Sequence, residues 1–340
     1  MDWRIYVTPA KLLLLLVLLP FLPGCEKERL VVISGPTMGT SYTVKLVGMG
    51  LDKMKIGAEI DAELKRINSL MSTYDEHSEL SQFNRSQGTD LFPTSPELLE
   101  VLRLSAEVHD HSDGAFDVTV GPLVNLWGFG PDPSRDSVPG DEEVEAARQR
   151  TGFGLLQIGG NGLHKENDLY VDLSAIAKGY AVDHVALVLD AWSIRNYLVE
   201  IGGELRAKGK NDRGISWTIA VEKPGSLSRS VFRTIELRDM SMATSGDYRN
   251  YFEVEGERYS HTIDPRTGQP ITNNVASVTV LAPSAAVADA YATAINVLGV
   301  EKGLSLAREL DLAVLILVKK ADGFIERVSP TLDVYLRGVP

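Results

Sequence analysis

Two residues four positions apart, Asp289 and Thr293, are suited to bind a metal ion together. They lie in an alanine-rich pattern typical of a helix, and residues four apart share one helix face. The pattern therefore places a carboxylate and a hydroxyl side by side. Such oxygens suit Mg²⁺, which usually takes one or two protein ligands and leaves its other positions to water and substrate phosphates.

His261 is the residue best suited to move a proton. It ends a strand-like run and precedes the loop sequence Asp264 to Gly268, in which proline presets φ and glycine supplies positive φ. An unperturbed imidazole titrates near pH ~6.5, which suits a general base. The plainer interpretation is a hydrogen-bonded histidine at the end of a strand.

Several upstream stretches, taken in order with these residues, carry a family resemblance. They are Met38 to Tyr42, Met71 to Asp75 with Ser78 to Ser81, Gly114 to Asp117 with Gly121 to Leu123, Asp172 to Tyr180, Gly202-Gly203 and Ser245 to Arg249. Together they resemble the ApbE family, the FAD:protein FMN transferases. The resemblance runs from about Met38 to Val328.

The resemblance implies a set of residues that line a site for FAD. They are Met38, Tyr74, Ala115, Phe116, Asp117, Asp172, Lys178 and Ile263. Tyr74 and Phe116 could offer ring faces or apolar walls to the flavin or adenine, and Lys178 could meet phosphate. Residue type alone would instead place Phe116 and Ile263 in the core and Lys178 on a solvated helix face.

The resemblance also implies that the backbone carbonyl of Ala175 joins Asp289 and Thr293 around Mg²⁺. Some relatives carry a second aspartate three residues after the first, whereas this chain has Ala292 there. The protein therefore supplies fewer ligands, and water would fill the gap. This departure bears on the affinity and identity of the metal more than on the reaction.

The reaction that the resemblance implies is Mg²⁺-dependent transfer of FMN from FAD to a threonine hydroxyl of an acceptor protein, with release of AMP. Phosphoryl transfer needs positioning and neutralisation of negative charge, which Mg²⁺ across both phosphates supplies. AMP leaves as a phosphate whose second pKa is about 6, so a strong general acid is unnecessary. The attacking alcohol must lose a proton, and His261 either accepts it or only positions phosphate.

Two other functions use the same residues. A Mg²⁺-dependent FAD pyrophosphatase would give FMN and AMP with water as the nucleophile. A non-enzymatic FAD-binding lipoprotein would need the pocket but not the metal, so Asp289 and Thr293 favour either enzyme over it. The sequence does not separate transferase from hydrolase, because the acceptor lies on another chain. The family implies that the acceptors are threonine-bearing subunits of membrane redox complexes.

Composition excludes some classes of protein. The chain has 340 residues, 44% of them hydrophobic, and can bury a substantial core. Its formal charge of −12 argues against a nucleic-acid binder. Gly203 to Lys210 only superficially resembles a P-loop, and no Gly-x-Gly-x-x-Gly sequence follows a predicted strand, so a Rossmann flavoprotein is disfavoured.

The first 24 residues are expected to be a lipoprotein signal peptide. Arg4 and Lys11 flank a leucine run that is shorter than the ~20 residues needed to span a bilayer. Leu22 to Cys25 is similar to a bacterial lipobox, which implies cleavage before Cys25 and lipidation of its thiol. Residues 25–30 would then be a lipidated tether and residues 31–340 the transferase domain, in the periplasm and anchored to the inner or outer membrane.

The body of the chain is expected to be α+β. Apolar spacing predicts a helix from about Leu51 to Met71, and Ser95-Pro96 begins another. The second half is rich in strands bounded by turn residues, with helices at 285–298 and 301–309. The strands are expected at 197–201, 205–208, 216–221, 231–236, 248–254, 258–262, 275–281, 313–317 and 324–328. The family resemblance implies two mainly antiparallel sheets with peripheral helices in one interwoven catalytic unit. As Cys25 is the only cysteine, the folded body has no disulfide.

Overall fold

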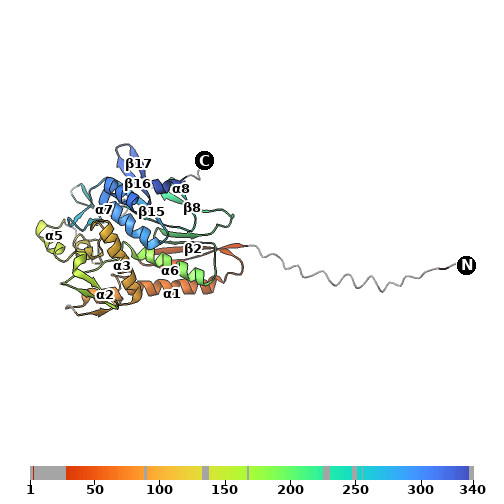
Figure 1. Cartoon of the computed structure of the whole chain (residues 1–340), viewed down its shortest axis with the longest axis horizontal. Helices are drawn as coiled ribbons and strands as arrows, with labels where there is room; N and C mark the ends of the chain where they lie inside the picture. Colours follow the sequence, from red (N-terminus) through yellow and green to blue (C-terminus); the bar gives the residue numbers. More distant parts are fainter. Residues whose placement is uncertain are drawn as a thin grey trace.

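The computed structural model describes residues 3, 28–87, 90–131, 138–166, 168–224, 230–246, 251–254 and 256–336. Within them the chain has the predicted α+β fold, with helices packed on a large antiparallel sheet (Figure 1). None of the helices in these ranges combines the length and apolarity that crossing a membrane requires. Cys25 and the predicted signal peptide, apart from Trp3, lie outside the described residues.

The large sheet has eight strands in the order β1-β2-β6-β7-β10-β15-β16-β17, and every neighbouring pair is antiparallel. The strands are β1 (Arg29–Thr37), β2 (Thr40–Gly48), β6 (Tyr197–Ile201), β7 (Glu204–Lys208), β10 (Ser241–Ser245), β15 (Val275–Ala282), β16 (Ala313–Lys320) and β17 (Gly323–Val328). The bounds of β6 are those predicted, whereas β10 was not predicted.

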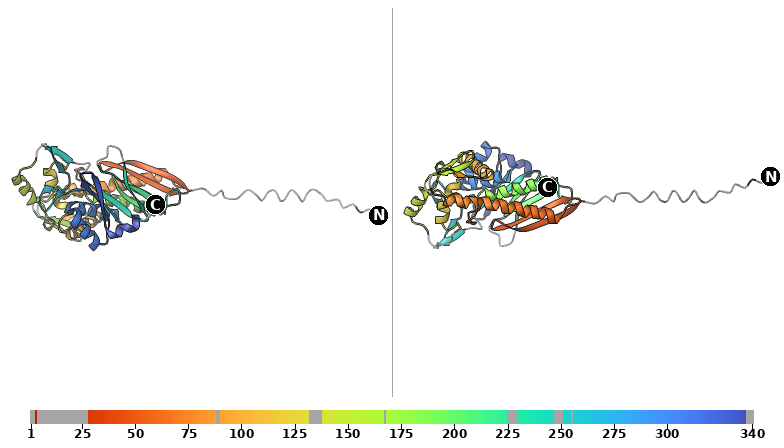
Figure 2. Two further views of the ribbon diagram at one scale, coloured as in Figure 1. Left: turned by 90° about the horizontal axis from the view of Figure 1, so that it is seen from above. Right: turned by 90° about the horizontal axis from the view of Figure 1, so that it is seen from below.

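Both faces of this sheet are buried. Alternate residues point to opposite faces of a strand, and Val278 and Val280 accordingly belong to the main core whereas Leu281 belongs to a second one. The main core lies under α1 (Lys53–Met71), α3 (Pro96–His111), α6 (Ala177–Ala191) and α7 (Ala285–Glu309). The hairpin of β8 (Trp217–Glu222) and β9 (Val231–Leu237) covers the other face with α8 (Asp333–Leu336), as the two views of Figure 2 help to follow.

The remaining strands form small sheets, so the strands divide into one large sheet and several small ones where two sheets were expected. One has three strands, β3 (Phe92–Pro93), β5 (Gly162–Lys165) and β4 (Leu156–Ile158), and the hairpins are β8–β9, β11 (Tyr251–Val254) with β12 (Glu257–Ser260), and β13 (Ile263–Asp264) with β14 (Gln269–Pro270). Short helices are α2 (Glu79–Arg85), α4 (Gly121–Leu126), α5 (Asp141–Arg148), η2 (Val118–Val120), η3 (Phe153–Leu155) and η4 (Pro330–Leu332). Turn residues divide part of the strand-rich half into short strands, and each of these pairs with the next strand along the chain as a two-stranded hairpin.

Side chains cap α1 and α3 at their first turns, and α1 begins at Lys53, two residues after its predicted start. Asp52 accepts a hydrogen bond from the Lys55 amide at the start of α1, and Ser95 accepts one from the Leu98 amide at the start of α3. Gly299 has φ 75° and ψ −174°, which interrupts α7. The two helices predicted at 285–298 and 301–309 are therefore confirmed as the two parts of α7.

Candidate active site

The N-terminal turns of α6 and α7 meet at the candidate metal residue Asp289. The backbone N–H of Gly179 donates a 3.0 Å hydrogen bond to Asp289 Oδ2, and Asp289 is only 5% exposed. A Cβ atom on Gly179 would lie 2.3 Å from the carbonyl oxygen of Ala285, so no larger residue allows the two helices to approach this closely. Glycine at this position therefore brings the start of α6 to the carboxylate.

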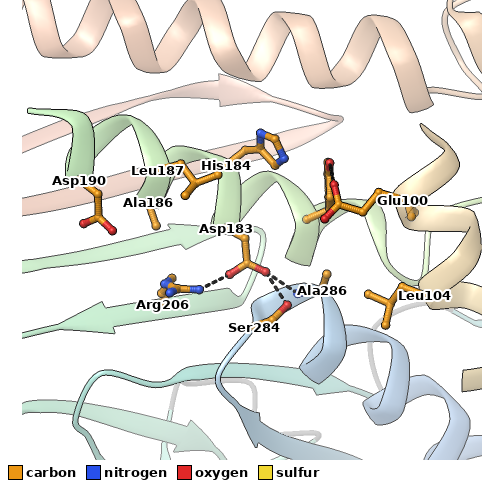
Figure 3. A pocket seen from close by; sticks show the side chains of 12 residues that line it. Glu100, Leu104, Asp183, His184, Ala186, Leu187, Asp190, Arg206, Ser284 and Ala286 are labelled. Carbon is orange, nitrogen blue, oxygen red and sulfur yellow. Dashed lines mark hydrogen bonds and ion pairs between the residues drawn. The ribbon is translucent and has the colours of Figure 1, made fainter. Parts of the chain in front are cut away.

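A second contact between the same two helices lies one turn further along α6. Asp183 Oδ2 accepts hydrogen bonds from the Ser284 hydroxyl at 2.7 Å and the Ala286 amide at 3.0 Å, while Oδ1 accepts one from Arg206 at 2.6 Å (Figure 3). These groups line a cavity of about 360 Å³ that contains none of the predicted site residues. We therefore interpret Asp183 as a structural link that fixes α6 against α7 and β7.

Lys178 lies between two buried acids. Its Nζ is 3.2 Å from Glu204 Oε1 and 3.9 Å from Asp289 Oδ2, and it donates a longer hydrogen bond of 3.4 Å to the Ser174 carbonyl. Burial raises the pKa of Asp289, and it raises the pKa of Glu204 to about 8, with Lys178 opposing both shifts. The two acids raise the pKa of Lys178 in turn, so its ammonium stays charged.

This cluster fits a divalent cation. Two acids face one ammonium, so the fully ionised cluster has an excess of one negative charge, and a cation beside Asp289 would favour both carboxylates. Thr293 is half-buried one turn after Asp289 on α7, and Ala175 precedes the first residue of α6 by two positions. No group of three or more His, Cys, Asp or Glu residues suited to a metal occurs in the described ranges, so the ligand set would be one carboxylate, one hydroxyl and one carbonyl, completed by water and substrate.

The turn between β1 and β2 lies beside this cluster. Met38 and Gly39 have φ of 46° and 70°, as in the two-residue hairpin turns that match strand twist. Methionine is rarely found with positive φ, and such strain clusters at binding sites. The amide of Gly202 donates to the Ser41 carbonyl at 3.1 Å, which joins the start of β2 to the turn between β6 and β7. Met38, a predicted FAD residue, therefore lies in the turn before the strand that contacts Gly202, and Glu204 begins the strand after Gly203.

A second group of predicted FAD residues surrounds Asp172. The Asp172 amide donates a 2.7 Å hydrogen bond to the Val118 carbonyl, which joins the Asp172 segment to the one that contains Ala115 to Asp117. Partial burial and the charge of Asp172 raise the pKa of Tyr74, which is 68% exposed. Asp172 also helps to raise the pKa of Lys178. The Asp172 segment therefore contacts the segment after Asp117, and Asp172 is close enough to Tyr74 and Lys178 to act on both electrostatically.

The side chains of Phe116 and Asp117 are engaged within the protein. Phe116 is 2% exposed in the main core, as its residue type alone suggests. Asp117 is 7% exposed and accepts hydrogen bonds from the Thr119 amide at 2.8 Å and hydroxyl at 2.6 Å, and burial raises its pKa. Any contact of these side chains with FAD stays a prediction.

His261 lies at the edge of an aromatic cluster. Its ring meets the ring of Phe129 edge-on, with 6.2 Å between centroids, and Phe129 in turn contacts Phe252 of β11. Ile263 is 5% exposed in a small core with Trp127, whose indole N–H donates to the Gly268 carbonyl at 2.9 Å. The loop that follows His261 is thereby held against the segment after α4. The role of His261 in proton transfer and that of Ile263 in FAD binding stay predictions.

Sequence reasoning missed Glu204. Gly202 and Gly203 belong to the quoted stretches, but the glutamate after them was not selected because glutamate is normally exposed. Its position between Ile201 and Leu205, in a strand of otherwise apolar and basic residues, was the available signal.

Comparisons with known proteins agree with this arrangement. The model of the ApbE family matches residues 38–316. A protein of Vibrio cholerae named FAD:protein FMN transferase is 50% identical over 328 residues, which cover 95% of this chain and 98% of the relative. The fold and the acid-lysine cluster thus occur in a chain whose relatives are flavin-transferring enzymes.

Two solved structures are also similar. The flavin transferase ApbE from Vibrio cholerae has a TM-score of 0.86 and 48% identity, covering 91% of this chain and 100% of that one. The flavinyl transferase ApbE of Pseudomonas stutzeri, in its apo form, has a TM-score of 0.86 and 40% identity, covering 92% and 99%. The chain belongs to the ApbE family.

Proposed function

We propose that this chain is an FAD:protein FMN transferase, which transfers FMN from FAD to a threonine hydroxyl of an acceptor protein and releases AMP. The observation that carries the proposal is the buried Asp289 carboxylate, held by the Gly179 amide at the joint of α6 and α7 with Lys178 3.9 Å away. This arrangement supports a site for a divalent cation and a phosphate in a member of a flavin-transferase family. Mg²⁺ bound there would neutralise charge on the FAD pyrophosphate.

The residues around Asp289 have separate roles in this proposal. Asp289, Thr293 and the Ala175 carbonyl would hold the metal, and Lys178 would meet a phosphate oxygen. Met38, Tyr74, Asp172, Ile263 and the segment Ala115 to Asp117 would line the FAD site. Of the two aromatic residues in this set, Tyr74 has the more exposed ring, which could stack on a flavin or adenine.

His261 would act on the acceptor hydroxyl. An alcohol is a poor nucleophile until it loses its proton, and an imidazole is suited to accept that proton. The edge-on contact with Phe129 supports a restricted ring orientation. The other role, in which His261 only positions phosphate, predicts that loss of the histidine mainly raises KM for FAD.

The experiment that tests the function separates transferase from hydrolase. The protein is incubated with FAD, Mg²⁺ and a threonine-bearing acceptor domain, with a Thr→Val acceptor as the matched control. Flavin fluorescence on the acceptor in a denaturing gel, absent from the Thr→Val control, would support the transferase. Free FMN and AMP with an unlabelled acceptor would instead support the pyrophosphatase, and binding of FAD without turnover would support a binding lipoprotein.

We also propose that Cys25 is lipidated and anchors the protein to a bacterial membrane on the periplasmic side. The export-like sequence that ends at Leu22 to Cys25 supports this. Several acyl chains on one residue would give durable anchoring. The mass of the protein purified from membranes should show loss of residues 1–24 and added acyl groups, and Cys25→Ser should move it to the soluble fraction. An unmodified Cys25 would contradict the anchor.

A further inference from the structure

Glu204 has no role in the reaction described above, yet it is among the most completely buried acids of the described residues. It is 4% exposed at the start of β7, and its Oε2 atom is buried without a hydrogen-bond partner. A buried carboxyl oxygen without a partner is costly, and a natural protein retains one where it serves a purpose. Its other oxygen faces Lys178 Nζ at 3.2 Å.

The turn that carries Glu204 also shapes the path of the lysine side chain. Gly202 has φ of 59°, and a Cβ atom there would lie 3.3 Å from Lys178 Cδ and 3.0 Å from Thr40 Cγ2. The stem of Lys178 therefore runs against the bare backbone of Gly202, and its ammonium ends at Glu204. Gly202 thus leaves room for the methylene groups of Lys178, and Glu204, two residues later, contacts the ammonium of the same side chain.

Lys178 would compete with a metal for Asp289. The Lys178 side chain is 29% exposed, and the acids within reach of its ammonium are Glu204 at 3.2 Å and Asp289 at 3.9 Å, the second distance being too long for a hydrogen bond. If Glu204 did not hold the ammonium, a movement of roughly 1 Å would bring it into direct contact with Asp289. The lysine would then occupy the carboxylate that the cation needs.

We propose that Glu204 is a positioning residue that holds the Lys178 ammonium away from Asp289, so that Asp289 is free to bind the divalent cation and the ammonium faces the phosphate. This inference rests on the metal site of the proposed function. Glu204 would raise the affinity of Asp289 for the cation only by holding Lys178 in place.

The test is a double-mutant comparison on FAD-free protein, with Mn²⁺ as the probe and free Mn²⁺ measured by electron paramagnetic resonance. Glu204→Gln should weaken Mn²⁺ binding by about tenfold to a hundredfold, the range for residues that orient metal ligands. Lys178→Met should not weaken it, because the competing ammonium is gone. Adding Lys178→Met to Glu204→Gln should restore binding to the level of Lys178→Met alone.

The restoration distinguishes positioning from a structural role. If the double variant binds Mn²⁺ as weakly as Glu204→Gln, or if Glu204→Gln binds as well as the wild type, the proposal is wrong. Should Glu204→Gln fail to fold, Glu204→Asp, whose carboxylate is one methylene further from the ammonium, takes its place with the same expectations. A wild type that binds no Mn²⁺ overturns the positioning role together with the metal site. Restoration of Mn²⁺ binding in the double variant, together with a wild type that shows no FMN transfer, would leave this role standing and reject the transferase.

Discussion

Gly179 and Asp289 are 110 positions apart in the chain, and the amide of the first donates a 3.0 Å hydrogen bond to the carboxylate of the second. The contact joins the first turn of α6 to α7. The positive end of the α6 dipole therefore points at the carboxylate that we assign to the metal. Any change in how these helices meet should alter both stability and metal binding.

Gly179→Ala should disturb this joint. The added Cβ would lie 2.3 Å from the Ala285 carbonyl oxygen and 2.8 Å from Ala286 Cα. Overpacking of this kind costs about 1–3 kcal/mol of unfolding free energy, which urea denaturation measures. Gly154→Ala is the matched control, because no atom lies within 4 Å of the Cβ added there. Equal stability of the two variants would contradict the close approach of α6 and α7.

Asp289→Asn should abolish metal-dependent activity without unfolding the protein. The amide oxygen can still accept from Gly179, but the negative charge that attracts the cation is lost. We expect turnover to fall by about 10²-fold or more, as for other groups that stabilise charge in a transition state, and stabilisation by Mg²⁺ in thermal unfolding to disappear. Asp190→Asn removes an acid that also pairs with a lysine, Lys208 at 2.8 Å, and should retain both properties. Normal activity of Asp289→Asn would reject the metal site.

His261→Ala should distinguish the two roles of the histidine. As a general base, its loss should lower kcat by about 10²- to 10⁴-fold and remove the rise of kcat with pH. As a phosphate-positioning group, its loss should mainly raise KM for FAD. A loss of less than tenfold in kcat/KM would make it a bystander. His164→Ala, in β5, is the control and should behave as the wild type.

Low pH should lower the free energy of unfolding partly through protonation of Glu63. Hydrogen bonds from Arg66 at 2.7 and 2.9 Å, with His184 nearby, lower the pKa of Glu63 below its ordinary value of 4.5. A group with a lowered folded pKa stabilises the protein above its unfolded pKa, and that contribution is lost as pH falls through the folded pKa. The difference in unfolding free energy between wild type and Glu63→Gln should therefore be full at pH 7 and shrink below pH ~4.5.

The comparison for this prediction is an exposed pair of the same spacing. Glu145 pairs with Arg148 at 2.7 Å on α5, and its side chain is 56% exposed. Exposed pairs contribute little to stability, so Glu145→Gln should differ little from the wild type across the same pH range. A Glu63→Gln difference that is constant with pH would show that the ion pair is not responsible.

Local sequence signals were enough for α1, α3, α7 and most strands, whereas the bounds of α6 were not predicted. The apolar spacing of Ile56, Ile60 and Leu64 predicted α1 and its buried face, and the break in α7 at Gly299 falls between the two helices predicted there. The strand β10 was not predicted, because the Ser-Met-Ala-Thr-Ser sequence has little intrinsic preference for a strand. Its neighbours β7 and β15 supply the pairing that its own residues do not specify.

The candidate site was predictable only in part. Helical periodicity alone placed Asp289 and Thr293 on one face, and the resemblance supplied the FAD residues. The proximity of Lys178 and Glu204 to Asp289 depends on how α6 packs on α7 and on the turn after β6, and both are long-range contacts. No spacing within the sequence encodes those distances, so the buried acid next to Lys178 was overlooked.

The strand β1 runs from Arg29 to the hairpin turn that contains Met38. Nine residues of extended chain at about 3.3 Å each place Met38 roughly 30 Å from Arg29. Figure 1 shows α5 at the end of the molecule opposite the start of β1. With the proposed anchor at Cys25, the Met38 turn of the candidate site would lie one strand length beyond Arg29, and an acceptor would have to reach that end of β1.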